Sequence, residues 1–222
     1  MLEVVLATSN PHKIVELDAI FRAERLTSVR LLSLKEAAKG KELIEPAEVG
    51  RTFEQNATIK AISYSLQTGM LCLADDSGIE VDALEGRPGV ISSHYATDGK
   101  ETGVSREERD TANNQRVMRE IDGIAPEKRG ARFVCAMALA QPTKKSIVYK
   151  CSGTFEGRIG VPPRVPSGVQ GFGYDPLFLV APNYIQTSSE LTPERKNQLS
   201  HRGQAARDMA AFLWEFMQAK RR

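Results

Sequence analysis

The sequence predicts an α/β fold with a mixed β-sheet, and two patterns in its 222 residues support this prediction. Short apolar or alternating runs, which are typical of strands, recur along the chain. Between them lie segments whose apolar residues are three or four positions apart, as on one face of a helix. No internal repeat or low-complexity stretch is visible. A chain of this length can bury a large core in one broad domain or in two lobes.

The first strand and the first two helices begin at recognisable local patterns. Residues 2–7 are mostly apolar and predict a strand. Asn10 can cap the next helix and Pro11 suits its first position. Thr52 and Gln55 match a capping box, in which Thr52 caps a helix and Gln55 reaches back to the cap. We therefore expect helices that begin at residues 11 and 53.

The middle of the chain predicts two strands separated by a turn, followed by a helix. The apolar run 70–74 indicates a buried strand, which we expect to end at the polar residues 75–78. Residues 79–83 alternate between apolar and acidic side chains, as in a half-buried strand. The heavily charged stretch that follows predicts an exposed helix over 105–121.

The C-terminal part predicts further strands, a long loop and a closing helix. The apolar run 133–140 indicates a buried strand, and residues 147–151 alternate again. Glycine and proline are frequent over 157–173, which predicts a loop, and 177–180 predicts a short strand. Apolar residues at helical spacing over 206–217 predict the last helix.

Composition excludes several classes of protein. The 30 Lys and Arg residues nearly balance the 28 Asp and Glu residues, which is a weak case for nucleic-acid binding. The longest apolar run, 133–140, is far shorter than the roughly 18 residues of a membrane helix. The N-terminus shows no signal-peptide pattern. We therefore expect no nucleic-acid partner, no membrane partner and a cytoplasmic location.

The cysteines also favour a cytoplasmic location. Cys72, Cys135 and Cys151 cannot all pair, and each lies in an apolar or alternating run. We expect buried free thiols in a reducing compartment. The chain has no CxxC motif or Cys/His cluster, which argues against a zinc site.

The first candidate site is the junction between the first strand and the first helix. Free backbone N–H groups and the helix dipole attract anions at such a junction. Lys13 adds a positive charge that suits phosphate, although an ordinary helix cap with a solvated lysine would explain the same pattern. The residues concerned are Thr8, Ser9, Asn10, Pro11, His12 and Lys13.

The second candidate site is the carboxylate pair Asp75 and Asp76. Two adjacent carboxylates after a buried strand repel each other unless a cation or basic partners stabilise them. Their hard oxygen atoms suit Mg²⁺, and one of them could orient a water molecule. Glu48 is a possible third carboxylate. An Asp-rich turn remains an equally good explanation of the pair.

Two further candidates lie near the C-terminus. Glycines on both sides of Phe172, in 171–176, let the backbone approach a ligand and leave the ring for stacking on a nucleobase. Lys196 with His201 and Arg202 offers donors for a base carbonyl or a phosphate. A structural glycine turn would explain the first pattern equally well, and a helix N-terminus capped by Ser200 with a solvated basic turn is the more ordinary explanation of the second.

Short segments match one known family in the same order along nearly the whole chain, and their collinear set is more specific than any single motif. The segments are Leu6–Asn10 with Lys13, Thr52–Phe53 with Asn56–Ala57 and Lys60–Ala61, Ala74–Gly78 with Glu80–Leu84, Gly86 with Pro88–Gly89, Arg132–Phe133, Gly171–Pro176 and Ser200–Gly203.

With these segments the sequence resembles the HAM1-like non-canonical purine nucleoside triphosphate pyrophosphatases, the inosine/xanthosine triphosphatase family. The resemblance implies a single domain over 1–222, an elongated α/β fold of two lobes around a central nucleotide-binding cleft, and usually a homodimer. It implies Mg²⁺-dependent hydrolysis of ITP, dITP and XTP to the monophosphate and pyrophosphate, which cleanses the nucleotide pool.

The resemblance also implies roles for individual residues. Asp76 is the catalytic and metal-side carboxylate, and Asp75 and Glu48 help to hold Mg²⁺. The triphosphate is held by Thr8, Ser9, Asn10, Pro11, His12 and Lys13, and Ser77 touches the substrate. The nucleotide and base pocket is formed by Phe172, Gly173, Tyr174, Asp175, Lys196, His201 and Arg202.

Three departures from the family pattern and two alternatives accompany this hypothesis. Gln55 stands where the family usually has Glu, His94 replaces a usual Arg, and residues 160–165 lengthen a loop. The related Maf-like nucleotide pyrophosphatases are the nearest alternative, but their first loop differs from Thr-Ser-Asn with a lysine. The other alternative is a nucleotide sensor without catalysis, but such a sensor would not need the carboxylates of Asp75 and Asp76.

Overall fold

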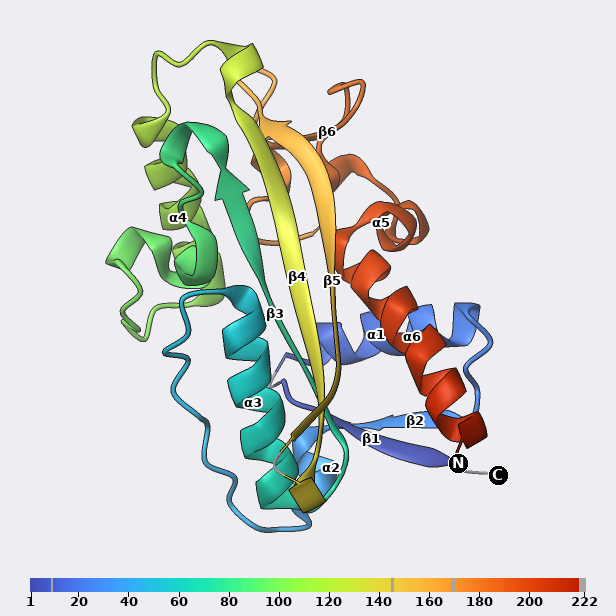
Figure 1. Cartoon of the computed structure of the whole chain (residues 1–222). Helices are drawn as coiled ribbons and strands as arrows, with labels where there is room; N and C mark the ends of the chain where they lie inside the picture. Colours follow the sequence, from blue (N-terminus) through green and yellow to red (C-terminus); the bar gives the residue numbers. More distant parts are fainter. Residues whose placement is uncertain (9, 145, 169–170, 220–222) are drawn as a thin grey trace. The chain divides into compact units, whose positions relative to one another are not determined.

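The computed structural model describes residues 1–8, 10–144, 146–168 and 171–219, apart from the side chains of Pro11, His12 and Lys144 (Figure 1). Its strands are β1 (Leu2–Leu6), β2 (Val29–Leu32), β3 (Cys72–Val81), β4 (Gly130–Gln141), β5 (Ser146–Ile159) and β6 (Phe178–Val180). Its α-helices are α1 (Pro11–Ala23), α2 (Leu34–Ala38), α3 (Phe53–Thr68), α4 (Arg106–Glu120), α5 (Pro193–Leu199) and α6 (His201–Ala219). No described helix is both long and apolar enough to cross a bilayer.

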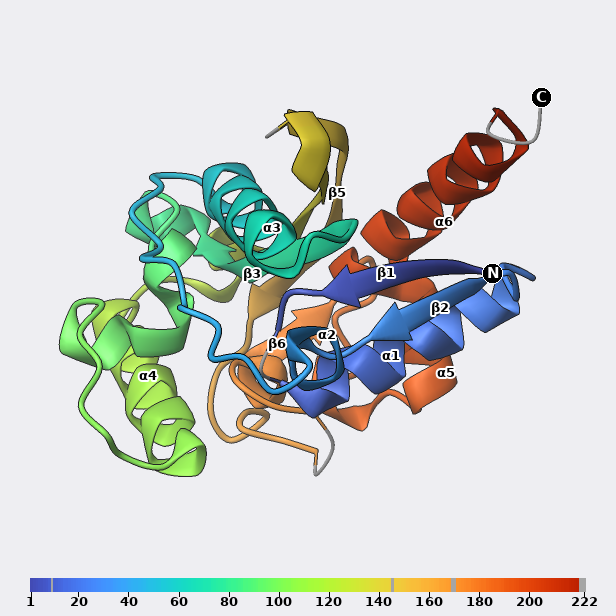
Figure 2. The same cartoon turned by 90° about the horizontal axis from the view of Figure 1, so that it is seen from below.

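One mixed sheet carries the six strands in the order β2-β1-β3-β4-β5-β6. β1 pairs in parallel with β2 and with β3, whereas β5 and β6 pair antiparallel. The side-by-side course of β1 and β2 can be followed in Figure 2. The predicted α/β class with a mixed sheet is therefore confirmed.

The chain divides into two compact units that interleave along the sequence. Unit 1 comprises Met1–Asp76, Cys135–Gly153 and His201–Arg222, and unit 2 comprises Ser77–Val134 and Thr154–Ser200. The nucleotide-binding cleft expected from the family resemblance stays a prediction.

Unit 1 has three layers, because successive residues of its strands point to opposite faces of the sheet. Val4 and Leu6 pack in one apolar cluster with α1 and α6, through residues such as Leu17 and Met209. Val5 and Ala7 pack in a second cluster with residues of α2 and α3. Both faces of β1 are thus buried, which explains its continuous apolar run.

Unit 2 has its own apolar core. Aromatic rings contribute much of it, with the ring centroids of Phe133 and Phe178 4.7 Å apart. Val117 and Ile121, at the end of α4, pack into the same cluster. Helix α4 begins after Ser105, whose side chain forms a capping box with Glu108. The helix predicted over 105–121 is confirmed.

Three local predictions were wrong in detail. Residues 75–78 are not a turn, because β3 runs without interruption from Cys72 to Val81. Strand β5 continues to Ile159, so the loop begins later than residue 157. Thr52 caps α3 as predicted, but Gln55 accepts a hydrogen bond from the N–H of Arg51 rather than from that of the cap.

Candidate active site

Strand alternation separates the two adjacent aspartates in unit 1. Cys72 and Ala74 pack in the cluster that contains α3 residues, whereas Leu73 packs in the cluster that contains α1 and α6 residues. The same alternation directs Asp75 toward α1 and α6, and Asp76 toward α3. Each carboxylate therefore finds basic partners on its own face of β3, which removes the mutual repulsion expected of a pair in a turn.

Asp75 is the centre of a buried ion-pair cluster. Its two carboxylate oxygens lie 2.9 and 2.8 Å from Nζ of Lys13, at the start of α1. Nε of Arg202, at the start of α6, lies 3.3 Å from the same carboxylate. Glu16 binds Arg202 on its other side, with 2.9 Å between Oε2 and Nη1. The cluster fixes two cations, from helices far apart in the sequence, beside the amino-terminal half of β3.

The two cations also determine the charge of Asp75. Burial by itself would raise the pKa of this carboxyl group, because only 1% of the side chain is exposed. Lys13 and Arg202 outweigh burial and hold the pKa of Asp75 well below its usual range. Asp75 is therefore ionised at neutral pH.

Asp76 lies in a different electrostatic environment. Nζ of Lys60, on α3, lies 3.3 Å from Oδ1 of Asp76 and 3.0 Å from Oε2 of Glu48. Oδ2 of Asp76 is buried and accepts no hydrogen bond within the described part of the chain. Burial raises the pKa of Asp76, with a further rise from Glu48, although Lys60 acts in the opposite direction. A buried carboxylate oxygen without a partner is suited to bind a cation or a water molecule.

The arrangement fits a metal ion only in part. Among the described residues, no group of three or more His, Cys, Asp or Glu side chains is arranged to hold a metal ion. Glu48 and Asp76 are brought together, but by the ammonium group of Lys60. Asp75 is engaged by Lys13 and Arg202 instead. Two hard carboxylates, with one free oxygen on Asp76, suit Mg²⁺ when substrate phosphates and water complete its ligands.

The junction between β1 and α1 has the predicted form. Oγ1 of Thr8 accepts a hydrogen bond from the N–H of Asn10, and the carbonyl of Asn10 accepts one from the N–H of Lys13. Ser9 lies outside the described residues, as do the side chains of Pro11 and His12. The helix N-terminus and Lys13 together form a cationic end of α1 beside Asp75.

Unit 2 contains a second cluster, around Phe172. Oδ2 of Asp175 accepts a hydrogen bond from the N–H of Phe172 at 2.8 Å and lies 2.6 Å from Nζ of Lys196. The same ammonium lies 5.4 Å from the centre of the Phe172 ring, which is 38% exposed. Gly171 has a φ of +90°, which only glycine adopts readily, and a Cβ there would clash with the carboxylate of Asp175.

The residues predicted for the nucleotide and base pocket belong to both compact units, and their grouping into one pocket stays a prediction. Tyr174 is buried in the core of unit 2, where its hydroxyl donates to the carbonyl of Ser92 at 2.7 Å. Lys196 belongs to unit 2, whereas His201 and Arg202 open α6 in unit 1. Within unit 1, Arg202 and Lys13 both contact the carboxylate of Asp75. Ser77 is the first residue of unit 2.

Sequence reasoning assigned no role to Lys60 or Glu16. Lys60 lies one turn after Asn56 on α3, and both are polar residues on a helix whose other buried positions are mostly apolar. That spacing could have indicated a polar stripe directed toward β3. Glu16 carried no such pattern, since an acidic residue on an amphipathic helix is ordinarily solvated.

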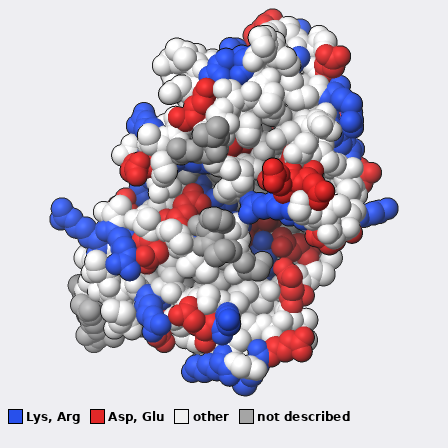
Figure 3. All heavy atoms as spheres, turned by 180° about the vertical axis from the view of Figure 1, so that it is seen from behind, with Lys and Arg blue, Asp and Glu red and all other residues white. Residues whose placement is uncertain are grey.

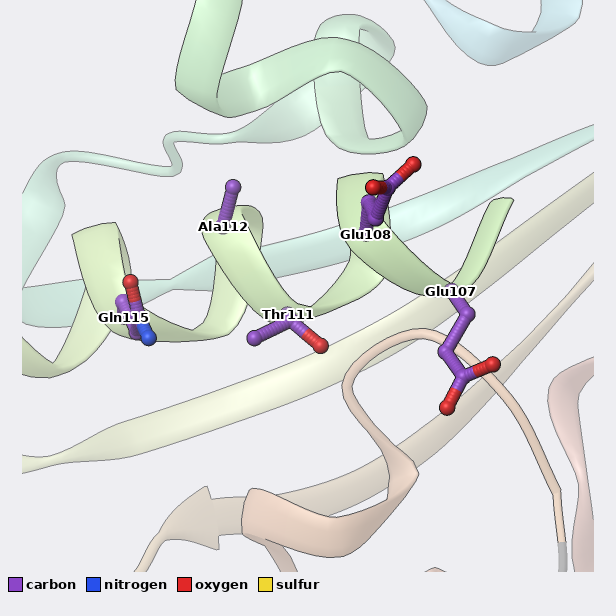
Figure 4. Close-up of a pocket in the computed structure, with 5 residues that line it drawn as sticks. All are labelled: Glu107, Glu108, Thr111, Ala112 and Gln115. Carbon is purple, nitrogen blue, oxygen red and sulfur yellow. The ribbon is translucent and has the colours of Figure 1, made fainter. Parts of the chain in front are cut away.

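One face of the molecule and one depression on α4 differ from these clusters. On the face shown in Figure 3, acidic and basic side chains are interspersed rather than gathered by sign. A shallow depression is lined by Glu107, Glu108, Thr111, Ala112 and Gln115, all on α4 (Figure 4). The side chain of Glu108 already caps α4 through Ser105, so this depression contains no arrangement for catalysis.

Comparisons with known proteins converge on one family. The model of the Ham1 family matches residues 4–212. A dITP/XTP pyrophosphatase of Frankia alni is 44% identical over 97% of this chain and 99% of its own length. One from Exiguobacterium sp. is 40% identical with the same coverage.

Solved structures agree with this result. A HAM1 protein from Coxiella burnetii has a TM-score of 0.79 and 38% identity, with 97% of this chain and 100% of that chain covered. A nucleoside-triphosphatase, also called dITP/XTP pyrophosphatase, from Mycobacterium abscessus has a TM-score of 0.71 and 38% identity. It covers 94% of this chain and 97% of its own.

Proposed function

Since the chain belongs to the Ham1 family, we propose that it hydrolyses dITP, XTP and ITP to the nucleoside monophosphate and pyrophosphate. The observation that carries this proposal is the environment of Asp76. One of its oxygens is buried without a hydrogen-bond partner in the described chain, beside Lys60 and Glu48. A nucleotide-binding protein without catalysis would have no use for such a carboxylate.

Hydrolysis at the α-phosphorus requires a positioned water molecule and a stabilised leaving group. The water oxygen forms a bond to phosphorus, the bond to the bridging oxygen of pyrophosphate breaks, and the water gives up a proton. Asp76 is suited to accept that proton, because burial raises the pKa of its carboxyl group. Lys13 and the N-terminus of α1 are suited to bind the triphosphate and stabilise the charge that develops on pyrophosphate.

We assign the metal-side role to Asp76 and Glu48, with Mg²⁺ as the ion. When bound, Mg²⁺ would neutralise phosphate charge and lower the pKa of a water molecule. Asp75 contributes from the other face of β3 by holding Lys13 and Arg202 in place. In this proposal Asp76 and Glu48 face the metal ion, whereas Asp75 faces the cations Lys13 and Arg202.

The base is recognised, in this proposal, by the cluster around Phe172 in unit 2. Phe172 offers an exposed aromatic face for stacking, and Lys196 offers a cation beside it. Donors that face a 6-oxo group would meet the 6-amino donor of adenine, which leaves polar groups unpaired and disfavours ATP. A homodimer, implied by the family resemblance, and a cytoplasmic location, expected from composition and the cysteines, belong to the same proposal.

The test is an assay that identifies both the leaving group and the atom attacked. The protein is incubated with Mg²⁺ and, separately, with dITP, XTP, ITP, GTP and ATP in ¹⁸O-labelled water, and the products are resolved by ³¹P NMR. We expect pyrophosphate, with the label in the monophosphate, from the first three substrates. Addition of EDTA should abolish turnover, and excess Mg²⁺ should restore it.

The matched control is Asp76→Asn, which keeps the size of the side chain and removes its charge. We expect a loss of about 10²-fold or more in kcat for this variant, in the range of other groups that bind or position the reacting atoms. Orthophosphate as the leaving group, label in pyrophosphate or equal turnover of ATP would contradict the proposal.

A further inference from the structure

One stripe of polar side chains on α4 contacts the loop that carries Phe172. Arg106, Asp110 and Asn114 are four residues apart and therefore lie along one face of the helix. The depression in Figure 4 involves neighbouring positions such as Glu107 and Thr111, which are exposed. The stripe and the depression occupy different positions around α4, and the stripe contacts the loop.

The stripe holds both backbone polar groups of Gly173. The carboxylate of Asp110 accepts a hydrogen bond from the N–H of Gly173, with 2.9 Å between the heavy atoms. Nδ2 of Asn114 donates to the carbonyl of Gly173 at 3.0 Å. Gly173 has a φ of +64°, a conformation that any other residue type would adopt with strain. Two side chains one turn apart thus fix the backbone next to Phe172.

Arg106 completes the stripe at the aromatic ring itself. The central carbon of its guanidinium group lies 4.4 Å from the centre of the Phe172 ring, within the range of a cation–π contact. Nε of Arg106 also lies 3.8 Å from the carboxylate of Asp110. The ring is therefore held through its backbone neighbour and through a planar cation, while 38% of Phe172 stays exposed.

We propose that Asp110 and Asn114, supported by Arg106, are positioning residues for recognition of the purine base. This inference rests on the proposed function. They fix Gly173 so that the exposed face of Phe172 is set for stacking before the nucleotide arrives. A loop that is ordered in advance spares the substrate the entropic cost of ordering it on binding. Neither residue takes part in the chemistry at phosphorus, so their effect falls on affinity for the base.

The experiment compares variants on the two faces of α4. Asp110→Ala and Asn114→Ala remove the contacts with Gly173, and Glu107→Ala and Thr111→Ala are the matched controls on the exposed face. For each variant, KM and kcat are measured with ITP. Calorimetry gives the dissociation constants of IMP, which contains the base, and of inorganic pyrophosphate, which lacks it.

For the stripe variants we expect KM for ITP and the dissociation constant of IMP to rise about tenfold, the range of one hydrogen bond to a charged group. We expect kcat to stay within about twofold of the wild-type value, because the lost interaction is one of binding. Pyrophosphate affinity and both controls should stay unchanged. Asp110→Asn, which keeps an acceptor oxygen, should recover most of the lost affinity.

Unchanged KM and IMP affinity in the stripe variants would overturn the inference. An equal loss of pyrophosphate affinity would also overturn it, since it would show a general structural defect instead. A wild-type protein that neither hydrolyses ITP nor binds IMP would contradict the proposed function itself. If the wild type is active and the stripe variants keep its KM and its affinity for IMP, only the positioning role is contradicted.

Discussion

The same substitution at two adjacent positions should have very different effects on stability. Asp75→Asn and Asp76→Asn each replace one carboxylate by an amide of nearly the same size. The two side chains lie on opposite faces of β3, and their pKa values are shifted in opposite directions. We therefore expect Asp75→Asn to destabilise the fold strongly and Asp76→Asn to leave stability nearly unchanged or increase it.

The size of the stability loss expected for Asp75→Asn follows from the contacts of the Asp75 carboxylate. The substitution removes the charge that lies 2.8 Å from Lys13 and 3.3 Å from Arg202. Arg202 keeps its ion pair with Glu16, whereas Lys13 has no second ion-pair partner within the described residues. Breaking a buried pair from one side costs about 3–5 kcal/mol. For a chain of this size, that corresponds to a fall in Tm of roughly 10 °C.

The change in stability expected for Asp76→Asn is small, and the reason is the raised pKa of Asp76. Its raised pKa means that the fold disfavours the ionised carboxylate at neutral pH. An uncharged amide avoids that cost, and Lys60 keeps Glu48 at 3.0 Å as a partner. We expect the free energy of unfolding of Asp76→Asn to lie within about 1 kcal/mol of the wild-type value or above it.

The assay is urea unfolding followed by circular dichroism from pH 3 to 8. Because folding raises the pKa of Asp76 above its unfolded value of about 3.9, the wild type should lose stability relative to Asp76→Asn as pH rises through that window. Folding lowers the pKa of Asp75 instead. Its contribution to stability is therefore present above about pH 3.9 and is lost only as pH falls through the lowered pKa. The difference between wild type and Asp75→Asn should therefore be constant from pH 5 to 8.

Similar losses of stability in both variants would refute this reasoning, because they would show that the two carboxylates share one environment. A loss below about 1 kcal/mol for Asp75→Asn would refute it as well, since that is the range of an exposed ion pair. Equal m-values among the three proteins are the control, because they show that the unfolded states are comparable.

Three further predictions follow from single positions. Gly78→Ala should destabilise the fold by about 1–3 kcal/mol in urea unfolding, because the new methyl would lie 2.8 Å from the carbonyl oxygen of Gly89. An unchanged urea concentration at the unfolding midpoint would contradict this prediction. Burial of Cys72 and partial burial of Cys151 raise the pKa of each thiol to about 12, so an aromatic disulfide reagent at pH 8 should label them quickly only after unfolding. Rapid labelling of both thiols in the native protein would contradict these raised pKa values. Lys60→Met should raise the pKa of the Asp76 carboxyl group in the metal-free protein, measured by NMR titration, because Lys60 is the cation that lowers it; an unchanged pKa would show that the ion pair is not formed in solution.

Much of the fold was accessible from local patterns. The capping residues Thr52 and Ser105 begin α3 and α4, and Pro11 begins α1, because these side chains satisfy or avoid the free N–H groups of the first turn. Strand β2 and helix α2 were not predicted. They have only four and five residues, which is too short for a period to be recognised.

The candidate site was predicted as a set of residues but not as an arrangement. The family resemblance implied that Asp76, Asp75 and Glu48 hold Mg²⁺, and that assignment stays a prediction. What the structure adds is that residues 75–78 continue a strand, in which alternation sends the side chains of Asp75 and Asp76 to opposite faces. Nothing local distinguishes the two aspartates, and only the helices packed on each face give them different partners.

The sequence by itself determined the α/β class, the family and the identity of the charged and aromatic residues available for chemistry. Those features depend on local spacing and on motifs in a fixed order. The tertiary structure alone decided that Lys13 and Arg202 meet at Asp75, that Lys60 meets Asp76, and that α4 contacts the Phe172 loop. The physical reason is that these contacts join segments far apart in the chain, so they exist only once strand pairing and helix packing have brought the segments together.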